Sequence, residues 1–150
     1  MEHFKSLSAV FPIILREYNG QTQVLLHRRQ NTGYMDGKWD FAGSGHVEEG
    51  ETASEAAVRE CSEETGLIVS AQDAQFAHLG HRIGAHTYYD IYFFFKSFTG
   101  SPQITEPEKC SALEWFEITA LPEEMIPIRR QAFQDALSGK LYSELREEKQ

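Results

Sequence analysis

The sequence has 150 residues, the usual size of one domain, and is long enough to bury a substantial core. Hydrophobic residues make up 41% and charged residues 25%, and no long apolar run or repeat is present, so membrane-spanning, fibrous and disordered classes are excluded. The formal charge of -9, from 14 basic and 23 acidic side chains, would repel a polyanionic backbone and argues against nucleic acid as a partner.

Cysteine usage and the N-terminal segment indicate the compartment. Cys61 and Cys110 are too few for a disulfide framework and lack the spacing of metal ligands. The apolar N-terminal stretch is interrupted by Pro12 and followed by Arg16, which is typical of neither a signal peptide nor a membrane anchor. These features predict a reduced, cytoplasmic protein that does not contact a membrane.

The first predicted elements form an antiparallel hairpin. Ser8 to Arg16 and Gln21 to Arg28 read as strands, and the Asn19-Gly20 pair between them is the strongest short-range hairpin signal. A glycine-rich loop follows from Gln30 to Gly45, with a short strand expected around Trp39 to Ala42. Such a loop in a compact domain usually lies close to a ligand or to another part of the backbone.

The best-defined element is a helix from Ala53 to Thr65. Its start carries a capping box, Thr52 to Glu55, and Gly66 stands where a left-handed helix terminator is expected. A second, amphipathic helix is predicted between Pro127 and Gly139.

Further strands are predicted between and after these elements, at Leu67 to Ser70, Gln75 to His81, Tyr88 to Phe98 and Ala112 to Ile118. The strand from Tyr88 is apolar on both faces, as a central strand would be. Strands outnumber helices and no linker divides the chain, so we expect one domain over residues 1–150, of the α+β class, with one mixed sheet and helices packed on it.

An unusual concentration of charge lies on the first helix. Residues 48–64 hold seven carboxylates and one base, Arg59. On a helix, Glu60, Glu63 and Glu64 fall within an arc of about 100°. Each like-charge pair at these spacings destabilises a helix by about 0.2 to 0.5 kcal/mol, so a cation is expected nearby, and Mg²⁺ or Mn²⁺ suits oxygen ligands. The alternative is an ordinary solvated helix face, but the glycine-rich loop just before the helix favours a functional site.

The stretch from Gly45 to Leu67 resembles the Nudix box, G-x5-E-x7-R-E-U-x-E-E-x-G-U, in which U is a bulky aliphatic residue. The positions that match are Gly45, Glu51, Arg59, Glu60, Glu63, Glu64, Gly66 and Leu67. Cys61 replaces an aliphatic residue but packs as a small hydrophobe. The preceding segment, residues 41–45, departs from the Phe-Pro-Gly-Gly often seen there and is one residue longer.

The resemblance implies the α/β/α Nudix sandwich and a MutT-like activity. The expected reaction is hydrolysis of a nucleoside diphosphate linked to another group, for example a nucleoside triphosphate, with Mg²⁺ or Mn²⁺. Cations are needed to neutralise a pyrophosphate bridge, and clustered carboxylates can hold them. We expect Glu60 and Glu64 to be the main metal ligands, completed by Glu63 and the backbone carbonyl of Gly45.

Two further roles are assigned within this resemblance. Arg59 is expected to pair with Glu51 or with a ligand carboxylate and to fix its rotamer, although a surface pair with Glu55 is the alternative. The general base is expected to be Glu63, with Glu106 in a later loop as second choice. Water rather than a cysteine is expected to attack phosphorus, because Cys61 faces away from the glutamate arc and Cys110 has Lys109 beside it but no histidine nearby in sequence.

Substrate recognition is expected outside the box. Arg28, Arg29 and Tyr34 lead into the glycine-rich loop and could bind phosphate or stack on a base. For the two arginines, a solvated strand end is an equally good interpretation.

Two other functions compete with a small-nucleotide hydrolase. An isopentenyl-diphosphate isomerase would need a cysteine in the loop before the box, and residues 30–45 contain none. A catalytically silent nucleotide-binding module is disfavoured by the intact box, and RNA decapping by the acidic balance. The sequence leaves open the substrate, the bond cleaved and whether the chain forms a homodimer.

Overall fold

The N-terminal hairpin is present in the computed structural model, which describes residues 1–147. Strands β1 (Leu7–Tyr18) and β2 (Gln21–Arg29) pair antiparallel. Asn19 and Gly20 join them with φ of 50° and 78°, the left-handed values that the tight hairpin turn requires at both central positions. The predicted hairpin is confirmed, and each strand extends slightly beyond its predicted ends.

The strands form one eight-stranded mixed sheet. Its main path runs in the order β3-β2-β1-β6-β5-β8, while β4 pairs with β1 and β7 pairs with β2. The β1–β6 and β5–β8 pairs are parallel and the others are antiparallel. The remaining strands are β3 (Trp39–Phe41), β4 (Gly45–His46), β5 (Gln75–Ile83), β6 (Thr87–Phe95), β7 (Cys110–Glu117) and β8 (Tyr142–Arg146).

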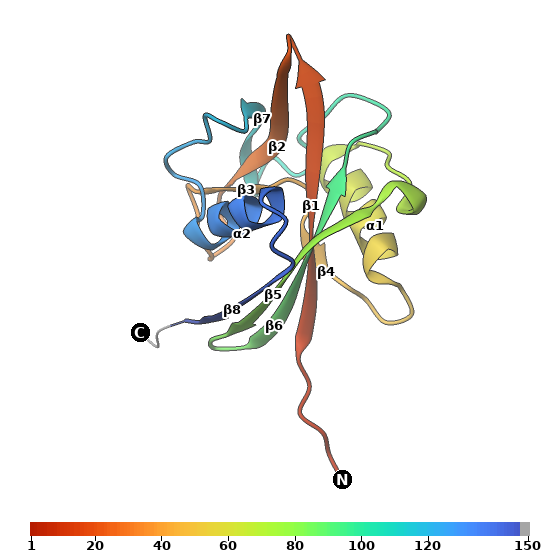
Figure 1. Cartoon of the computed structure of the whole chain (residues 1–150), viewed down its shortest axis with the longest axis vertical. Coiled ribbons are helices and arrows are strands. Elements are labelled where there is room, and N and C mark those ends of the chain that lie inside the picture. Colours follow the sequence, from red (N-terminus) through yellow and green to blue (C-terminus); the bar gives the residue numbers. More distant parts are fainter. Residues whose placement is uncertain (148–150) are drawn as a thin grey trace.

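Both predicted helices are confirmed. Helix α1 (Ala53–Thr65) begins with the predicted capping box of Thr52 and Glu55 and ends at Gly66, whose φ is 74°. Helix α2 (Pro127–Leu137) begins with a proline in its first turn. A short 3-10 helix, η1 (Ala71–Asp73), lies between α1 and β5. The two α-helices lie on opposite sides of the central strands (Figure 1).

The core has two layers because alternate residues of the buried strands face opposite sides of the sheet. Phe11 of β1 belongs to the layer that includes Phe133 of α2. Val10, next to it in sequence, belongs to the layer that includes Ala57 and Cys61 of α1. The result is an α/β/α sandwich, which confirms the predicted fold class.

Some predicted boundaries are wrong. Residues 67–70 do not form a strand, because only Ile68 pairs, with Thr99. Strand β6 ends at Phe95 rather than Phe98. Strands β4 and β8 were not predicted: β4 has two residues, and β8 is a largely exposed edge strand that lacks the alternation of a half-buried one.

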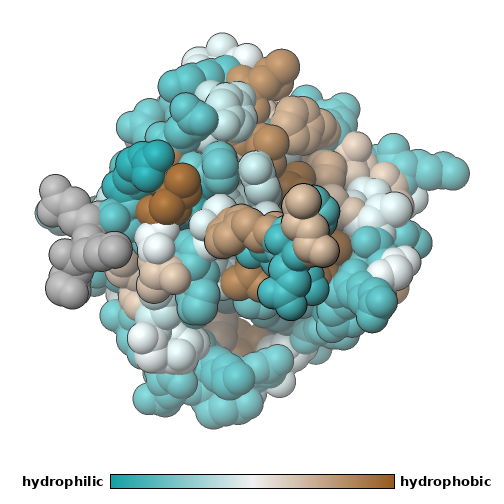
Figure 2. Space-filling view, turned by 90° about the horizontal axis from the view of Figure 1, so that it is seen from below, coloured by the Kyte–Doolittle hydropathy of each residue, from teal (hydrophilic) through white to brown (hydrophobic). Residues whose placement is uncertain are grey.

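The surface is mixed in character. Viewed from the end that carries the N-terminus, hydrophobic residues occur in separate patches among hydrophilic ones (Figure 2). Neither α-helix in the described part of the chain has the length and apolarity needed to cross a membrane.

Candidate active site

A cleft of about 680 Å³ opens beside the last turns of α1. One end of the cleft is acidic, because Glu60, Glu63 and Glu64 of α1 meet Glu106 from the loop before β7. Gly45 of β4 also lines this end. The cleft therefore brings together the predicted metal ligands and both candidates for the general base.

Two glycines allow the loop before α1 to approach the helix closely. Gly43 has a φ of 84°, and a Cβ there would lie 3.1 Å from the Cα of Cys61. Strand β4 pairs with β1 through Gly45 and Val10, which holds Gly45 beside Glu60. A Cβ at position 45 would overlap the Glu60 carboxylate. A side chain at position 45 would therefore force the Glu60 carboxylate to move, and the constraint at this position is space rather than backbone angles.

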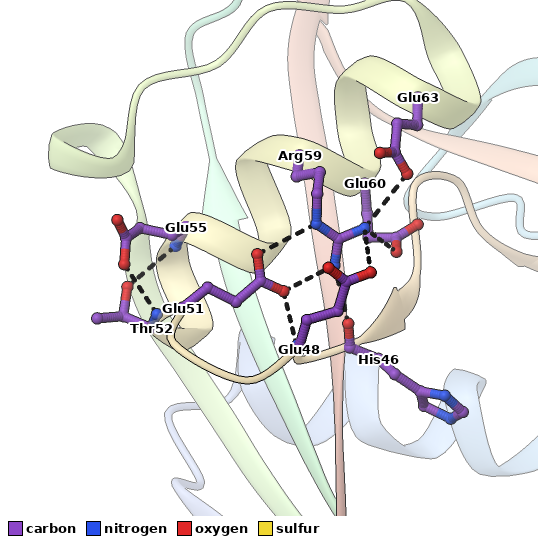
Figure 3. Close-up of polar contacts among 8 residues, drawn as sticks. All are labelled: His46, Glu48, Glu51, Thr52, Glu55, Arg59, Glu60 and Glu63. Atoms are coloured by element: carbon purple, nitrogen blue, oxygen red, sulfur yellow. Dashed lines mark hydrogen bonds and ion pairs between the residues drawn. The ribbon is translucent and has the colours of Figure 1, made fainter.

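Arg59 is the centre of the ion-pair network on α1 (Figure 3). Its Nη2 donates to Glu51 Oε1 at 2.7 Å and its Nε to Glu51 Oε2 at 3.1 Å. Its Nη1 donates to Glu60 Oε1 at 2.7 Å and to Glu63 Oε2 at 3.2 Å. The expected pairing of Arg59 with Glu51 is therefore present, whereas Glu55 is turned toward Thr52 in the capping box.

The network shifts the ionisation of its members in opposite directions. The hydrogen bond from Arg59 lowers the pKa of Glu51, and the Glu51 carboxylate in turn is the main cause of a raised Arg59 pKa. Burial raises the pKa of Glu60, although the hydrogen bond and charge of Arg59 oppose this. Arg59 thus fixes the position of Glu60, although burial disfavours the ionised form of its carboxylate.

Glu64 has weaker compensation, because only a hydrogen bond from the Gly43 backbone lowers its pKa. Burial, followed by the charges of Glu60, Glu106 and Asp40, raises its pKa to about 8. Its Oε2 atom is buried and has no hydrogen-bond partner. Within residues 1–147 only two other buried side-chain atoms share this condition, His27 Nε2 and Arg129 Nε, and both residues line the same cleft. Unpaired buried polar atoms that converge on one cleft indicate a site built for a ligand.

The acidic end fits a divalent cation in its donor chemistry. A buried carboxylate oxygen without a partner, beside three further carboxylates, is the oxygen-rich environment that Mg²⁺ and Mn²⁺ prefer. In the described part of the chain, however, the side chains are not arranged so that three or more aspartate, glutamate, histidine or cysteine residues could hold a metal ion together. The carboxylates of Glu60 and Glu63 are instead paired with Arg59.

The two candidates for the general base lie on neighbouring segments. The Glu63 side chain is 57% exposed. Thr105 donates from Oγ1 to the backbone carbonyl of Glu63 at 2.6 Å, which ties the loop that carries Glu106 to the end of α1. Both glutamates therefore face the same space.

Of the three predicted substrate-binding residues, the structure places two in the cleft. Arg29 and Tyr34 line it, and Arg29 donates from Nε to the Tyr34 carbonyl at 2.8 Å. Arg28 is exposed, donates to Ser111 Oγ and does not line the cleft. His27 and Arg29, two residues apart on β2, both line the cleft, as side chains on one face of a strand do, whereas Arg28 between them does not.

The floor of the cleft contains charged residues that the sequence analysis did not identify. Asp40, Arg82 and Arg129 line it, and Asp90 is paired with both arginines behind it. Two signals were available. Asp90 is the only charged residue in an otherwise apolar strand, and Arg129 shares the buried helix face of Ala132, Phe133 and Ala136.

Comparison with known proteins assigns the chain to a family. The model of the NUDIX domain matches residues 8–136. The chain belongs to the Nudix family. As a Nudix protein it is a pyrophosphohydrolase, an enzyme that hydrolyses phosphorus-containing anhydrides. The predicted MutT-like resemblance is thereby confirmed, and residues 45–67 lie inside the matched domain.

Individual Nudix relatives agree with this assignment. A Bacillus subtilis (strain 168) protein, provisionally named an 8-oxo-dGTP diphosphatase, is 33% identical over 86% of this chain and 78% of its own length. A Caenorhabditis elegans protein, provisionally named nudix hydrolase 1, is 35% identical over 81% of this chain, which corresponds to 32% of that longer protein. The crystal structure of a MutT NUDIX hydrolase from Burkholderia pseudomallei superposes with a TM-score of 0.75 at 23% identity, covering 87% of this chain and 98% of the other.

Proposed function

We propose that the protein is a divalent-cation-dependent pyrophosphohydrolase that cleaves a nucleoside diphosphate linked to another group, with nucleoside triphosphates as the leading substrate class. The observation that carries the proposal is the buried, unpartnered Glu64 carboxylate oxygen at the acidic end of the cleft. An ionised carboxylate in this position is most stable beside a cation. Hydrolysis of a pyrophosphate also needs a cation, which neutralises the phosphate charge. The name of the Bacillus subtilis relative, which concerns a nucleoside triphosphate, supports this substrate class.

The cation, Mg²⁺ or Mn²⁺, would be held by Glu60, Glu63, Glu64 and the backbone carbonyl of Gly45. When bound, it neutralises phosphate charge and polarises both phosphorus and the attacking water. Arg59 holds the Glu60 carboxylate in position while Glu51 anchors the other edge of the guanidinium. Ligand carboxylates fixed in this way need less reorganisation when the substrate arrives.

Water is the proposed nucleophile. Its oxygen forms the new bond to phosphorus, the bridging P–O bond breaks, and the proton of the water passes to a glutamate. Glu63 is the proposed general base, because its exposed carboxylate can turn into the cleft, and Glu106 is the second candidate. Burial raises the pKa of Cys61 to about 12 and also raises that of Cys110, so neither thiol is an activated nucleophile.

Substrate binding is assigned to Arg29 and Tyr34. The guanidinium carbon of Arg29 lies 5.5 Å from the centre of the Tyr34 ring. The Nη1 atom of Arg29 lies 3.7 Å from Asp40 Oδ2. The loop after β2 thus places a cation and an aromatic ring together at the edge of the cleft. This combination suits a phosphate and a base.

A substrate screen tests the proposal. Nucleoside triphosphates including 8-oxo-dGTP, nucleotide sugars, dinucleotides and ADP-ribose are each incubated with Mg²⁺ or Mn²⁺, and phosphate and pyrophosphate are measured separately. We expect hydrolysis of at least one nucleotide that disappears with a chelator. Binding of these compounds without turnover would instead favour the silent module, and no binding of any of them would contradict the proposal.

A further inference from the structure

The floor of the cleft carries a feature that the proposed hydrolysis does not use. Arg129 reaches it from α2, and its side chain is only 3% exposed. Its Nη1 donates to Asp90 Oδ2 at 3.2 Å and to the Tyr92 hydroxyl at 2.7 Å. The guanidinium carbon lies 3.7 Å from the centre of the Phe11 ring. The guanidinium is therefore fixed by hydrogen bonds at its Nη1 edge and by the Phe11 ring on one face.

One buried donor of this fixed group has no partner. The Arg129 Nε–H is buried and has no hydrogen-bond partner. Asp40 Oδ1 lies 3.7 Å from this Nε, which compensates charge but is too long for a hydrogen bond. A buried donor without an acceptor is destabilising, so the site is most stable when a ligand supplies the acceptor.

The charges of the floor indicate that this acceptor is a neutral group. Asp40 and Asp90 are both buried next to Arg129, and a phosphate in the same place would meet their negative charge. Asp90 already accepts hydrogen bonds from Arg82 and Arg129, so the floor offers no free cation for a dianion. The phosphates are better placed at the glutamate end with the cation, which leaves the floor for the base.

His27 supplies a second unfilled position beside it. Its Nε2 is buried without a partner, and burial lowers the pKa of the ring. A neutral imidazole can donate or accept at Nε2, depending on its tautomer. His27 can therefore adapt to the ligand, whereas the guanidinium of Arg129 can only donate. Arg129 is the group that can discriminate between ligands.

We propose that Arg129 is a specificity-determining residue whose Nε–H donates to an oxo group on the six-membered ring of the substrate base. A carbonyl oxygen is the strongest neutral acceptor that a base offers, and arginine reads the O6 edge of guanine in the same way in nucleic-acid complexes. The protein then prefers 6-oxopurine nucleotides, and uracil or thymine nucleotides with the equivalent 4-oxo group, over nucleotides that lack it. This inference rests on the proposed function.

The test compares two nucleotides that differ at this edge. Inosine triphosphate carries the 6-oxo group, and purine riboside triphosphate lacks it. With the wild-type protein and Mg²⁺ we expect kcat/KM to be roughly 10- to 100-fold higher for inosine triphosphate, the effect of losing a hydrogen bond to a charged donor. Equal values would overturn the inference while leaving the proposed hydrolysis intact.

Variants assign this preference to the residue. Arg129→Lys keeps a positive charge near Asp90 but lacks the Nε–H at its position, so the ratio of the two kcat/KM values should fall toward 1. Arg130→Lys on the same helix is the matched control, because Arg130 donates to the Pro122 carbonyl and does not line the cleft. The control should keep the wild-type ratio. A merely structural Arg129 would lower both kcat/KM values together and leave their ratio unchanged, which would contradict the proposal.

A measurement on the unmodified protein covers the case in which Arg129→Lys does not fold or no triphosphate is cleaved. The ¹⁵Nε–¹H resonance of Arg129 is followed by NMR during titration with inosine monophosphate and with purine riboside monophosphate. We expect a shift with the first and none with the second. The same response to both, or no response to either, would refute the role of Arg129 whatever the outcome of the hydrolysis assays.

Discussion

The Cα of Gly45 lies directly against the carboxylate of Glu60, so that any side chain at position 45 would occupy the space of that carboxylate. The contact joins β4 to α1 and depends on the pairing of Gly45 with Val10 of β1. It links a residue of the glycine-rich loop to a proposed metal ligand through shape alone. Two of the matched box positions, 15 residues apart in sequence, thus form one structural unit.

Gly45→Ala should therefore displace the Glu60 carboxylate and reduce activity by roughly 10- to 100-fold, the usual effect of disturbing a ligand's support. The measurement is kcat/KM as a function of Mg²⁺ concentration, with folding checked by circular dichroism. Gly80→Ala is the matched control, because a Cβ there would meet its neighbours only at 3.7 Å or beyond. Unchanged activity of Gly45→Ala would show that the position of Glu60 does not matter.

Glu60→Gln should weaken the dependence on the divalent ion directly. The substitution keeps the shape and removes the charge, so we expect the half-saturating Mg²⁺ concentration to rise about 10-fold or more. Glu55→Gln serves as the control, because it lies on the same helix and glutamine also supports a capping box. Wild-type activity of Glu60→Gln at ordinary Mg²⁺ concentration would count decisively against its role as a ligand.

Glu64 should make the metal-free protein less stable as the pH rises. Its folded pKa of about 8 lies above the ordinary value of 4.5, so the folded state binds more protons than the unfolded state between these values, and the free energy of unfolding falls across that range. Each pKa unit of difference between the folded and unfolded states corresponds to about 1.4 kcal/mol in the free energy of unfolding. The effect at Glu64 is smaller than this because water screens a partly exposed group. Urea unfolding at pH 5 and pH 8 with a chelator measures this fall.

In the same experiment Glu64→Gln should remove most of the pH dependence and be more stable than wild type at pH 8. Added Mg²⁺ should flatten the wild-type curve, because a bound cation favours the ionised carboxylate. A wild-type curve that does not fall between pH 5 and pH 8 would mean that the carboxylate is compensated by other groups.

The sequence predicted the acidic end of the cleft better than its floor. The capping box and Gly66 define α1 through interactions within one turn of each end, so the arc of Glu60, Glu63 and Glu64 followed from helix geometry. The floor depends on contacts between residues 39 positions apart, such as Arg129 with Asp90, which no local pattern contains. The position of Arg28 outside the cleft has a related cause, since which face of β2 meets the ligand is decided by the rest of the sheet.

Replacing both cysteines by alanine should leave catalysis almost unchanged. Cys61 of α1 is fully buried, and burial raises the pKa of the Cys110 thiol, so neither is expected to act as a nucleophile. The expected cost is about 1 kcal/mol in the free energy of unfolding, from lost packing. The measurements are kcat/KM and urea unfolding of the double variant. A folded double variant without activity would point to a thiol nucleophile.

The identity of the nucleophile can be read from isotope incorporation. If water attacks phosphorus, single-turnover hydrolysis in ¹⁸O-labelled water places the label in one of the phosphate products during the first turnover. If Glu63 is the base, Glu63→Gln should lower kcat by about 10²-fold or more while the first turnover still carries the label, and Glu106→Gln should do so if the base is Glu106 instead. The two substitutions are matched, since both remove one charge from the same end of the cleft. Products without solvent label in the first turnover would mean that a protein group attacked first, and the direct attack of water would have to be abandoned.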